Sequence, residues 1–413
     1  MNAPFVLLGL GMLLGRPAPA FGAPRAPEDF TSPQARAALG KKLGVNPVAV
    51  ERGEAMARFR ARLDAVGGAA GASPRPVRVL LLGDSHVASD FISGMARSLL
   101  QARFGDAGRG LVHADQRWGY GGRRLKRREA DWDRPRVVDA KGPGKRYGLF
   151  GLALVAKRKG ASVSYRVRPK DRFVELHHEG GFELTLNGKS LGRAEAADGT
   201  TVTRLEVPAG KKPSTLVVKA QRRGARLYGL GFETGQPGLL LSAIGPVGAD
   251  TKVYLQLEPS SFRADLTAHE PDLIVLMVGG NDALKVRKGW RSLDAVREDH
   301  ERLVALLRET VPAADLLLLG PMDAGQRKGG KVRSKPRIRE VRDLQAEVAG
   351  ALDLAWWDTL EAMGGAGAIK RWVKAGVMNK DLVHPGKPAA DVLGALAAEA
   401  VLDWYDGGAK STD

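Results

Sequence analysis

The feature that most constrains the fold is a short apolar run that ends in a polar turn and leads into a helical pattern. Residues 77–82 are apolar except for Arg78, and Gly83-Asp84-Ser85-His86 follows them directly. Residues 91–104 then carry apolar side chains at helical spacing. This order predicts a buried strand, a tight turn and a helix.

The same alternation returns after residue 237. Apolar runs predict strands over 239–244, 273–278 and 316–319. Helical periodicity predicts helices over 293–310, 338–352 and 388–405. Strands that alternate with helices favour a parallel sheet covered on both faces, so we expect an α/β fold with three layers, α/β/α.

The middle of the chain breaks this alternation. Short strand-like runs cover 162–168, 173–177, 182–186, 202–207, 216–219 and 227–232. The turn signals Asn187-Gly188, Asp198-Gly199 and Pro208-Ala209-Gly210 separate several of them. We therefore predict an antiparallel β module over 119–236, inserted between the two parts of the α/β domain, 77–118 and 237–413.

The N-terminal region divides into two predicted parts. Residues 5–14 are apolar and Ala18-Pro19-Ala20 offers a small-x-small cleavage site, which predicts a signal peptide over 1–23 although no Lys or Arg precedes the apolar run. A disordered start is the alternative. Export to the periplasm or beyond is then expected, with no transmembrane span in the mature chain.

Residues 24–76 form a helical and linker region, with a helix expected over 47–66 and a linker over 71–76.

The amino-acid composition limits the kinds of active-site chemistry and the kinds of partner that are possible. The 413 residues include no Cys, which excludes disulfides, thiol catalysis and Cys-ligated zinc. The formal charge is +18, and residues 121–230 hold most of it, with 26 Lys and Arg against 11 Asp and Glu, a net charge of +15. Such a field favours anionic polymers as partners, but a solvated basic surface is the simpler interpretation of clusters such as 123–128, 157–159 and 222–223.

Three motifs follow predicted strands or precede the last helix. Ser85 lies where an α/β fold exposes a side chain at the carboxyl edge of its sheet, although a helix N-cap explains an isolated serine there. Asn281, in Gly279-Gly280-Asn281-Asp282, can donate two hydrogen bonds without titrating, or can form a simple turn. Asp381 stands three residues before His384 and can orient its imidazole, although a solvated loop histidine is the alternative.

Together, in the order Ser85, Asn281, Asp381 and His384, these motifs resemble those of the SGNH (GDSL-like) hydrolase superfamily. The resemblance covers about residues 77–118 and 237–405. It implies a flavodoxin-like parallel sheet, a Ser85 nucleophile, a His384 base oriented by Asp381, and an oxyanion hole formed by Ser85, Asn281 and a glycine. For that glycine we favour Gly248 over Gly245, because Pro246 follows Gly245.

Within the superfamily, Gly83-Asp84-Ser85-His86, the segment 104–110 and the β insertion are similar to bacterial peptidoglycan O-acetylesterases. The resemblance implies a periplasmic enzyme that removes acetyl groups from O6 of N-acetylmuramic acid, with no metal or organic cofactor and no nucleic-acid partner. The insertion is then a candidate glycan-binding module. An O-acetyltransferase or an esterase for another acylated polymer remains an alternative, as does a basic envelope-polymer-binding module without activity.

Five further residues receive structural interpretations. His177 and His178 are adjacent in a predicted strand, so their side chains point to opposite faces and cannot share one metal; surface positions are expected. His86 either lines the pocket or makes a local hydrogen bond. Trp356 and Trp357 are expected to pack in the core.

Overall fold

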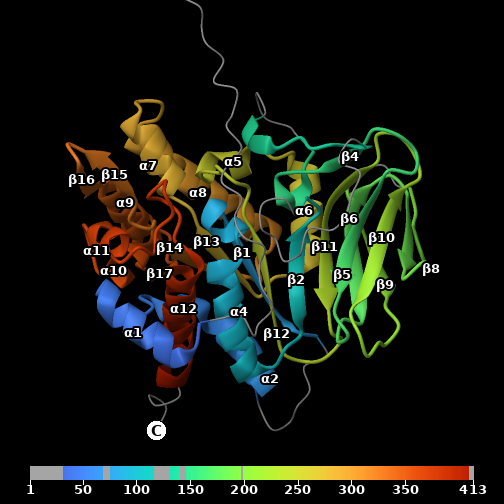
Figure 1. The fold of residues 1–413 in the computed structure, drawn as a ribbon, viewed down its shortest axis with the longest axis horizontal. Coiled ribbons are helices and arrows are strands. Elements are labelled where there is room, and N and C mark those ends of the chain that lie inside the picture. The colour runs from blue at the N-terminus through green and yellow to red at the C-terminus, as the bar shows by residue number, and fades with distance from the viewer. Residues whose placement is uncertain (1–30, 68–74, 116–130, 140–145, 197–198, 409–413) are drawn as a thin grey trace, which may run out of the picture.

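The structure is a computed structural model that describes residues 31–67, 75–115, 131–139, 146–196 and 199–408. Its centre is a parallel sheet whose spatial order is β12-β1-β13-β14-β17 (Figure 1). The strands are β1 (Val77–Gly83), β12 (Leu239–Ile244), β13 (Leu273–Met277), β14 (Asp315–Leu319) and β17 (Ala355–Trp357). Numbered along the chain this order is 2-1-3-4-5, the flavodoxin-like arrangement, so the predicted fold class is confirmed.

Alternate residues of β1 pack into two separate cores. Val79 and Leu81 join one apolar cluster, and Leu80 and Leu82 join another. Helices α1 (Pro33–Leu43), α2 (Ala57–Gly67), α4 (Phe91–Phe104) and α12 (Lys387–Gly408) cover the first face. Helices α5 (Thr251–Leu255), α6 (Pro259–His269), α8 (Leu293–Thr310) and α9 (Ile338–Ala351) cover the second. This burial on both faces explains why the strands are apolar throughout rather than alternating.

The helix predicted over 47–66 is wrong in its first part. Only 57–67 is α-helical, preceded by the 3-10 turn η2 (Gly53–Met56). The backbone of Glu51 instead exchanges two hydrogen bonds with Trp356, of 2.9 and 3.0 Å. This bridge to the edge strand β17 keeps Glu51 out of a helix, an outcome that local periodicity does not reveal.

The inserted region forms two antiparallel sheets, at the right of Figure 1. The first is ordered β5 (Ser162–Val167), β10 (Ser214–Ala220), β7 (Phe182–Leu186) and β8 (Lys189–Ala194). The second is ordered β3 (Trp132–Asp133), β4 (Leu154–Ala156), β11 (Arg226–Glu233), β6 (Phe173–Glu179) and β9 (Thr201–Glu206), and β2 (Gly108–His113) also pairs with β11. Each strand predicted here is present to within two residues. Antiparallel pairing starts at Gly108, upstream of residue 119.

Strand β8 was not predicted, because its Lys189-Ser190-Leu191-Gly192-Arg193 sequence is polar and mostly exposed. The turn before it was predicted. Asn187 and Gly188 have φ values of 49° and 82°, the left-handed backbone that a two-residue hairpin turn requires. The turn residues therefore predict a hairpin here, although the side-chain pattern of β8 does not predict a strand.

The shorter elements complete the chain. They are α3 (Ser85–Ala88), α7 (Gly280–Arg287), α10 (Thr359–Ala362), α11 (Ile369–Lys374), the hairpin β15 (Gly325–Lys328) and β16 (Lys331–Ser334), and the 3-10 turns η5 (Val137–Asp139) and η6 (Gly148–Phe150). Trp356 and Trp357 are buried in the two cores, which confirms their predicted packing role.

The junction between the antiparallel sheets and the α/β core is polar and buried. His177 on β6 and His178 are 1% and 0% exposed, so the predicted surface positions are wrong. His177 Nδ1 lies 2.8 Å from Asp265 Oδ1 on α6, and Asp265 Oδ2 accepts a 2.8 Å bond from the Leu149 backbone N–H. Burial alone lowers the pKa of His177, but the Asp265 carboxylate outweighs it and the pKa is raised. The buried polar atoms have partners that offset part of their desolvation: Asp265 for His177 Nδ1, and Gly180 O and the Thr203 hydroxyl for His178.

Several predictions lie outside the described residues: the signal peptide over 1–23, most of the linker over 71–76, and the basic cluster 123–128. Arg158 and Lys157, in the basic cluster 157–159, pair with Asp131 and Asp133. Among the residues that the structure describes, no helix combines the length and apolar character that crossing a membrane requires.

We expect Asp265→Ala to lower the free energy of unfolding by about 3 kcal/mol, because it leaves a buried imidazole and a buried N–H without their acceptor. Urea unfolding followed by circular dichroism measures this. Glu309→Ala is the matched control, since its carboxylate pairs with Arg263 at an exposed position and its loss should cost less than about 1 kcal/mol. Equal effects of the two substitutions would contradict the importance of this junction.

Candidate active site

The site residues lie beyond the carboxyl ends of neighbouring parallel strands. Ser85 follows β1 and Asn281 follows β13, and the two strands are paired with Gly83 opposite Met277. In a 2-1-3-4-5 sheet the chain leaves β1 toward one side and crosses to the other at the β1/β13 boundary, which is where such folds bind ligands. The sheet topology therefore brings the turn of Ser85 next to the turn of Asn281.

The turn after β1 is capped by Asp84, not by Ser85. The Asp84 side chain accepts a hydrogen bond of 2.9 Å from the backbone N–H of His86, and Ser85 is the first residue of α3. The interpretation of Ser85 as a helix cap is therefore wrong. Because Asp84 caps the helix, the Ser85 hydroxyl is available for a hydrogen bond to another partner. Ser85 as a whole is 7% exposed.

Ser85, His384 and Asp381 form one chain of hydrogen bonds. The distance from Ser85 Oγ to His384 Nε2 is 2.7 Å, and that from His384 Nδ1 to Asp381 Oδ2 is also 2.7 Å. The other Asp381 oxygen accepts bonds of 2.9 and 3.0 Å from the backbone N–H groups of Val383 and His384. In the neutral tautomer whose Nδ1–H donates to the carboxylate, Nε2 is the acceptor for the hydroxyl proton of Ser85. The alternative of a solvated loop histidine is excluded.

The charge on Asp381 is stabilised by the same contacts. Burial alone raises the pKa of this carboxyl, but hydrogen bonds from the His384 imidazole and from two backbone N–H groups outweigh it and hold the pKa well below its ordinary value. Leu382 bends the loop with φ = 58°, unusual for a residue with a branched side chain. Its backbone is held on both sides, because Leu382 N–H donates to Asn379 and Leu382 O accepts from Gly325.

Asn281 uses its side-chain amide to join two neighbouring turns. Nδ2 donates to Ala249 O at 2.8 Å and to Asp84 Oδ2 at 3.1 Å. The helix it belongs to, α7, starts after Gly279, whose φ is 116° and where a Cβ atom would lie 2.9 Å from Gln345. Glycine is required there for backbone conformation and for space. The Asn281 amide thus lies beside the turn that carries Ser85.

The two candidate glycines of the preceding loop differ in environment. A Cβ on Gly245 would lie 2.2 Å from Asp84 O, so Gly245 permits close packing against the Ser85 turn. Gly248 has φ = 87°, is exposed, and a Cβ there would meet nothing within 4 Å. Ala249, directly after Gly248, is the acceptor of Asn281. Gly248 is therefore exposed, whereas Gly245 is buried against the turn that carries Ser85.

Sequence reasoning missed that His86 connects distant loops. His86 Nδ1 lies 3.0 Å from Asp84 Oδ1, the local bond that was expected, and Nε2 lies 3.2 Å from Val383 O, 297 positions away. Both neighbours are acceptors, so the imidazolium form satisfies both. Burial alone lowers the pKa of His86, but the Asp84 carboxylate outweighs it and raises the pKa. The His immediately after Ser85 was the only signal available.

The buried carboxyl of Asp282, the residue after Asn281, bonds the start of α7 to the start of α5. Asp282 accepts bonds of 3.4 and 3.3 Å from the Thr251 backbone N–H and hydroxyl, at the start of α5. Burial, together with the neighbouring Asp250 carboxylate, raises the pKa of Asp282 to about 7. Lys285 pairs with Asp250 at 2.6 Å. These contacts fasten α7 to the loop that carries Gly248.

The arrangement can activate a hydroxyl. An imidazole that accepts the proton of Ser85 at one nitrogen and donates to a carboxylate at the other matches the geometry of serine acyl transfer. The donors needed for a developing oxyanion, namely the N–H of Ser85 and the Asn281 amide, belong to adjacent turns. Direct hydrogen bonds thus link Ser85, His384 and Asp381. The Asn281 side chain is hydrogen-bonded to Asp84, the residue before Ser85, and to Ala249, the residue after Gly248.

Comparisons with known proteins agree with this geometry. Residues 230–390 match the model of the GDSL-like Lipase/Acylhydrolase family, a range that includes Gly248, Asn281, Asp381 and His384. No curated protein matches the chain.

Solved structures extend the comparison to the fold. A structure described as a peptidoglycan O-acetylesterase in action is 22% identical, with a TM-score of 0.68, and the match covers 86% of this chain and 97% of that one. A protein from Bacillus subtilis is 12% identical, with a TM-score of 0.35 and coverage of 71% and 90%. A family two carbohydrate esterase from Clostridium thermocellum is 13% identical, with a TM-score of 0.31 and coverage of 64% and 99%.

The first of these structures shares the fold of this chain over almost its whole length. The family match over residues 230–390, together with the convergence of the serine, histidine and acid motifs, supports an ester-hydrolysing enzyme whose C-terminal part is similar to the GDSL-like lipases and acylhydrolases.

Proposed function

We propose that the protein is an exported serine esterase that removes O-acetyl groups from a cell-envelope polysaccharide, and that its substrate is peptidoglycan acetylated at O6 of N-acetylmuramic acid. The observation that carries the proposal is the continuous chain of 2.7 Å bonds from Ser85 to His384 to Asp381. The fold similarity to a peptidoglycan O-acetylesterase supports the substrate. The sequence features of a signal peptide support the location.

In the first step, Ser85 Oγ attacks the acetyl carbonyl carbon and His384 Nε2 takes the hydroxyl proton. Asp381 stabilises the imidazolium that forms, because it remains a carboxylate. The tetrahedral intermediate collapses when His384 protonates the sugar oxygen, which leaves as an alcohol. An acetyl-Ser85 ester remains.

The oxyanion of the intermediate would receive hydrogen bonds from the N–H groups of Ser85 and Gly248 and from the Asn281 amide. Both protons of that amide are already used, by Ala249 at 2.8 Å and by Asp84 at 3.1 Å. We infer that the longer bond, to Asp84, is exchanged for the oxyanion, while the shorter one keeps the side chain in place. The amide then stabilises the transition state more than the ground state.

In the second step, His384 takes a proton from water as the water attacks the acetyl carbonyl carbon. The bond to Ser85 Oγ then breaks, His384 returns the proton to Ser85 Oγ, and acetate is released. A sugar hydroxyl in place of water would make the enzyme an O-acetyltransferase with the same residues. Assays that include chito-oligosaccharide acceptors separate these outcomes, because transfer yields acetylated acceptor and hydrolysis yields only acetate.

We expect Ser85→Ala to lower kcat/KM for p-nitrophenyl acetate and acetate release from O-acetylated peptidoglycan by about 10⁴-fold, because the nucleophile is lost. Ser93→Ala is the matched control: Ser93 is buried in α4 and donates to Asp90, away from the Ser85–His384 chain. Its activity should stay within about threefold of the wild type. Equal acetate release by the wild type and Ser85→Ala would eliminate the mechanism.

Asp381→Asn tests the orienting carboxylate and its pH dependence. We expect kcat to fall about 10⁴-fold, since an amide can hold the wrong tautomer of His384. Because the folded pKa of Asp381 lies below the usual 3.8, its charge stabilises the fold at neutral pH, and this contribution disappears as the pH falls through the folded value. The difference in unfolding free energy between wild type and variant should therefore shrink from about pH 5 to about pH 2. A difference that grows on acidification would contradict this assignment.

Asn281→Ala tests the oxyanion role. We expect kcat to fall about 10²-fold or more with KM nearly unchanged, because the amide acts mainly in the transition state. Steady-state kinetics on p-nitrophenyl acetate measures both constants. A rise in KM with unchanged kcat would instead make Asn281 a residue that binds the ground state.

A further inference from the structure

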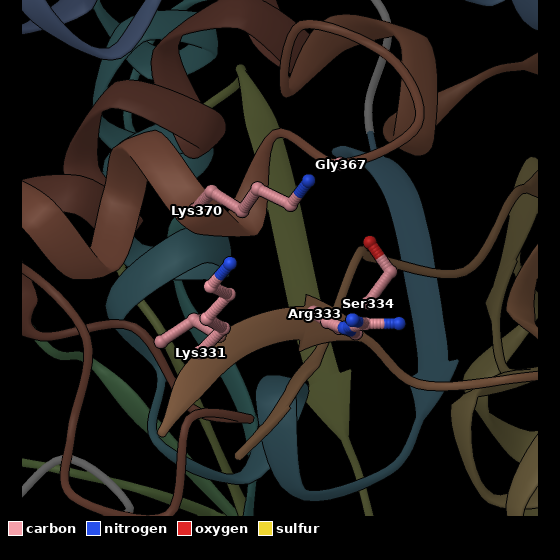
Figure 2. A pocket seen from close by; sticks show the side chains of 6 residues that line it. Lys331, Arg333, Ser334, Gly367 and Lys370 are labelled. Atoms are coloured by element: carbon pink, nitrogen blue, oxygen red, sulfur yellow. The ribbon is translucent and has the colours of Figure 1, made fainter. Parts of the chain in front are cut away.

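An open cavity of about 590 Å³ lies between the β15–β16 hairpin and α11, apart from the Ser85–His384 chain. Its lining residues are Lys331, Val332, Arg333, Ser334, Gly367 and Lys370. Figure 2 shows the amino groups of Lys331, on the hairpin, and Lys370, on α11, reaching into the same space, with the Ser334 hydroxyl at its side. Three of the six lining residues are cations, and none is an acid.

The three cationic residues of the cavity lining are exposed. None of Lys331, Arg333 and Lys370 forms an ion pair with a residue in the described part of the chain. Elsewhere the described arginines and lysines are extensively paired, as with Lys285 and Asp250 or Arg342 and Asp358. Three cations gathered without a counter-charge repel one another, so an anion that enters the cavity relieves this repulsion and gains attraction.

The cavity walls are held in place by a buried carboxyl beneath them. Asp323 Oδ2 accepts a 3.0 Å bond from the Ser334 hydroxyl and another of 3.0 Å from the Ile369 backbone N–H, which ties the hairpin to α11. Asp323 is 1% exposed, and burial raises its pKa above the ordinary value. The hairpin and the helix therefore present their cations from a fixed frame.

The same hairpin is attached to the catalytic loop. Gly325 N–H, at the start of β15, donates a 2.6 Å bond to Leu382 O, between Asp381 and His384. In the hairpin Gly325 pairs with Ser334, the last residue of β16 and part of the cavity lining. At ~3.3 Å per strand residue, Lys331 lies roughly 10 Å along β16 from Ser334. The cavity therefore extends along the hairpin, away from the end that is bonded to the catalytic loop.

We propose that this cavity is an anion-binding subsite that receives a carboxylate of the acetylated glycan at a distance from the ester being cleaved. This inference rests on the proposed function and specifies its substrate class further: glycans with anionic substituents, such as the free carboxylates of peptidoglycan peptide stems. Lys331 and Lys370 bind the carboxylate from two walls, and the Arg333 guanidinium supplies further donors. The subsite positions the polymer and takes no part in the bond changes at Ser85.

The test compares two triple variants of the full-length chain. Lys331→Ala/Arg333→Ala/Lys370→Ala removes the cavity cations. Lys189→Ala/Lys211→Ala/Lys212→Ala removes the same net charge from the antiparallel sheets, at the opposite end of the molecule (Figure 1). Three substrates are used: O-acetylated peptidoglycan, the same polymer with its carboxylates amidated, and p-nitrophenyl acetate.

We expect the cavity variant to raise KM for O-acetylated peptidoglycan about tenfold relative to the other triple variant, with kcat little changed. Wild-type KM for this polymer should also rise between about 50 and about 300 mM NaCl, more steeply than that of the cavity variant. On amidated polymer the two triple variants should be equal. Equal KM values on the native polymer, or a defect that persists after amidation, would overturn the subsite.

A binding readout separates this inference from the proposed function. In the Ser85→Ala background, co-sedimentation with peptidoglycan should be weakened by the cavity substitutions and by amidation of the polymer. If the wild type hydrolyses p-nitrophenyl acetate but releases no acetate from peptidoglycan, the proposed substrate fails while this binding measurement still decides the subsite. Binding that the cavity substitutions leave unchanged would reject the subsite, even if acetate release is normal. A cavity variant that loses p-nitrophenyl acetate activity or thermal stability would also contradict a role confined to the polymer.

Discussion

The pairing of β1 between β12 and β13 is the constraint on which the rest of the site depends. The register sets Leu82 opposite both Ile244 and Leu276, so the three strands end at the same level of the sheet. Because parallel strands all point the same way, the turns that follow them converge at one edge. Ser85, Gly248 and Asn281 all lie in such turns. Only His384 must be supplied from elsewhere, by the loop before α12.

That loop is secured by polar contacts more than by packing. His86 bonds to Val383, Gly325 bonds to Leu382, and Asp381 accepts the backbone N–H groups of its own turn. The first two contacts join the loop to residues in or next to other strands and the third fixes its own turn, so the imidazole of His384 is held from several directions. Preorganisation of this kind reduces the cost of reaching the transition state. The contact through Gly325 also couples the loop to the hairpin whose cations form the proposed subsite.

The charge of the chain has two separate consequences. Residues 121–230 carry most of the excess, but described cations there, such as Arg158 and Arg204, are neutralised by acids brought close in the folded sheets. The cavity between the β15–β16 hairpin and α11 holds fewer cations, yet Lys331, Arg333 and Lys370 form no ion pair with a described residue. Local pairing, which net charge does not report, decides where an anionic polymer is attracted.

The sequence by itself determined the alternation of strands and helices, the antiparallel insertion, and the identities of Ser85, Asn281, Asp381 and His384. These are local signals: apolar runs, turn residues, and motifs at strand ends. Only the tertiary structure decided that Glu51 pairs with β17, that His177 and His178 are buried, that Asp84 caps α3, and that His86 reaches Val383. Each of these depends on a partner between 25 and about 300 positions away or on competition for one cap, because burial is decided by which distant group satisfies a polar atom.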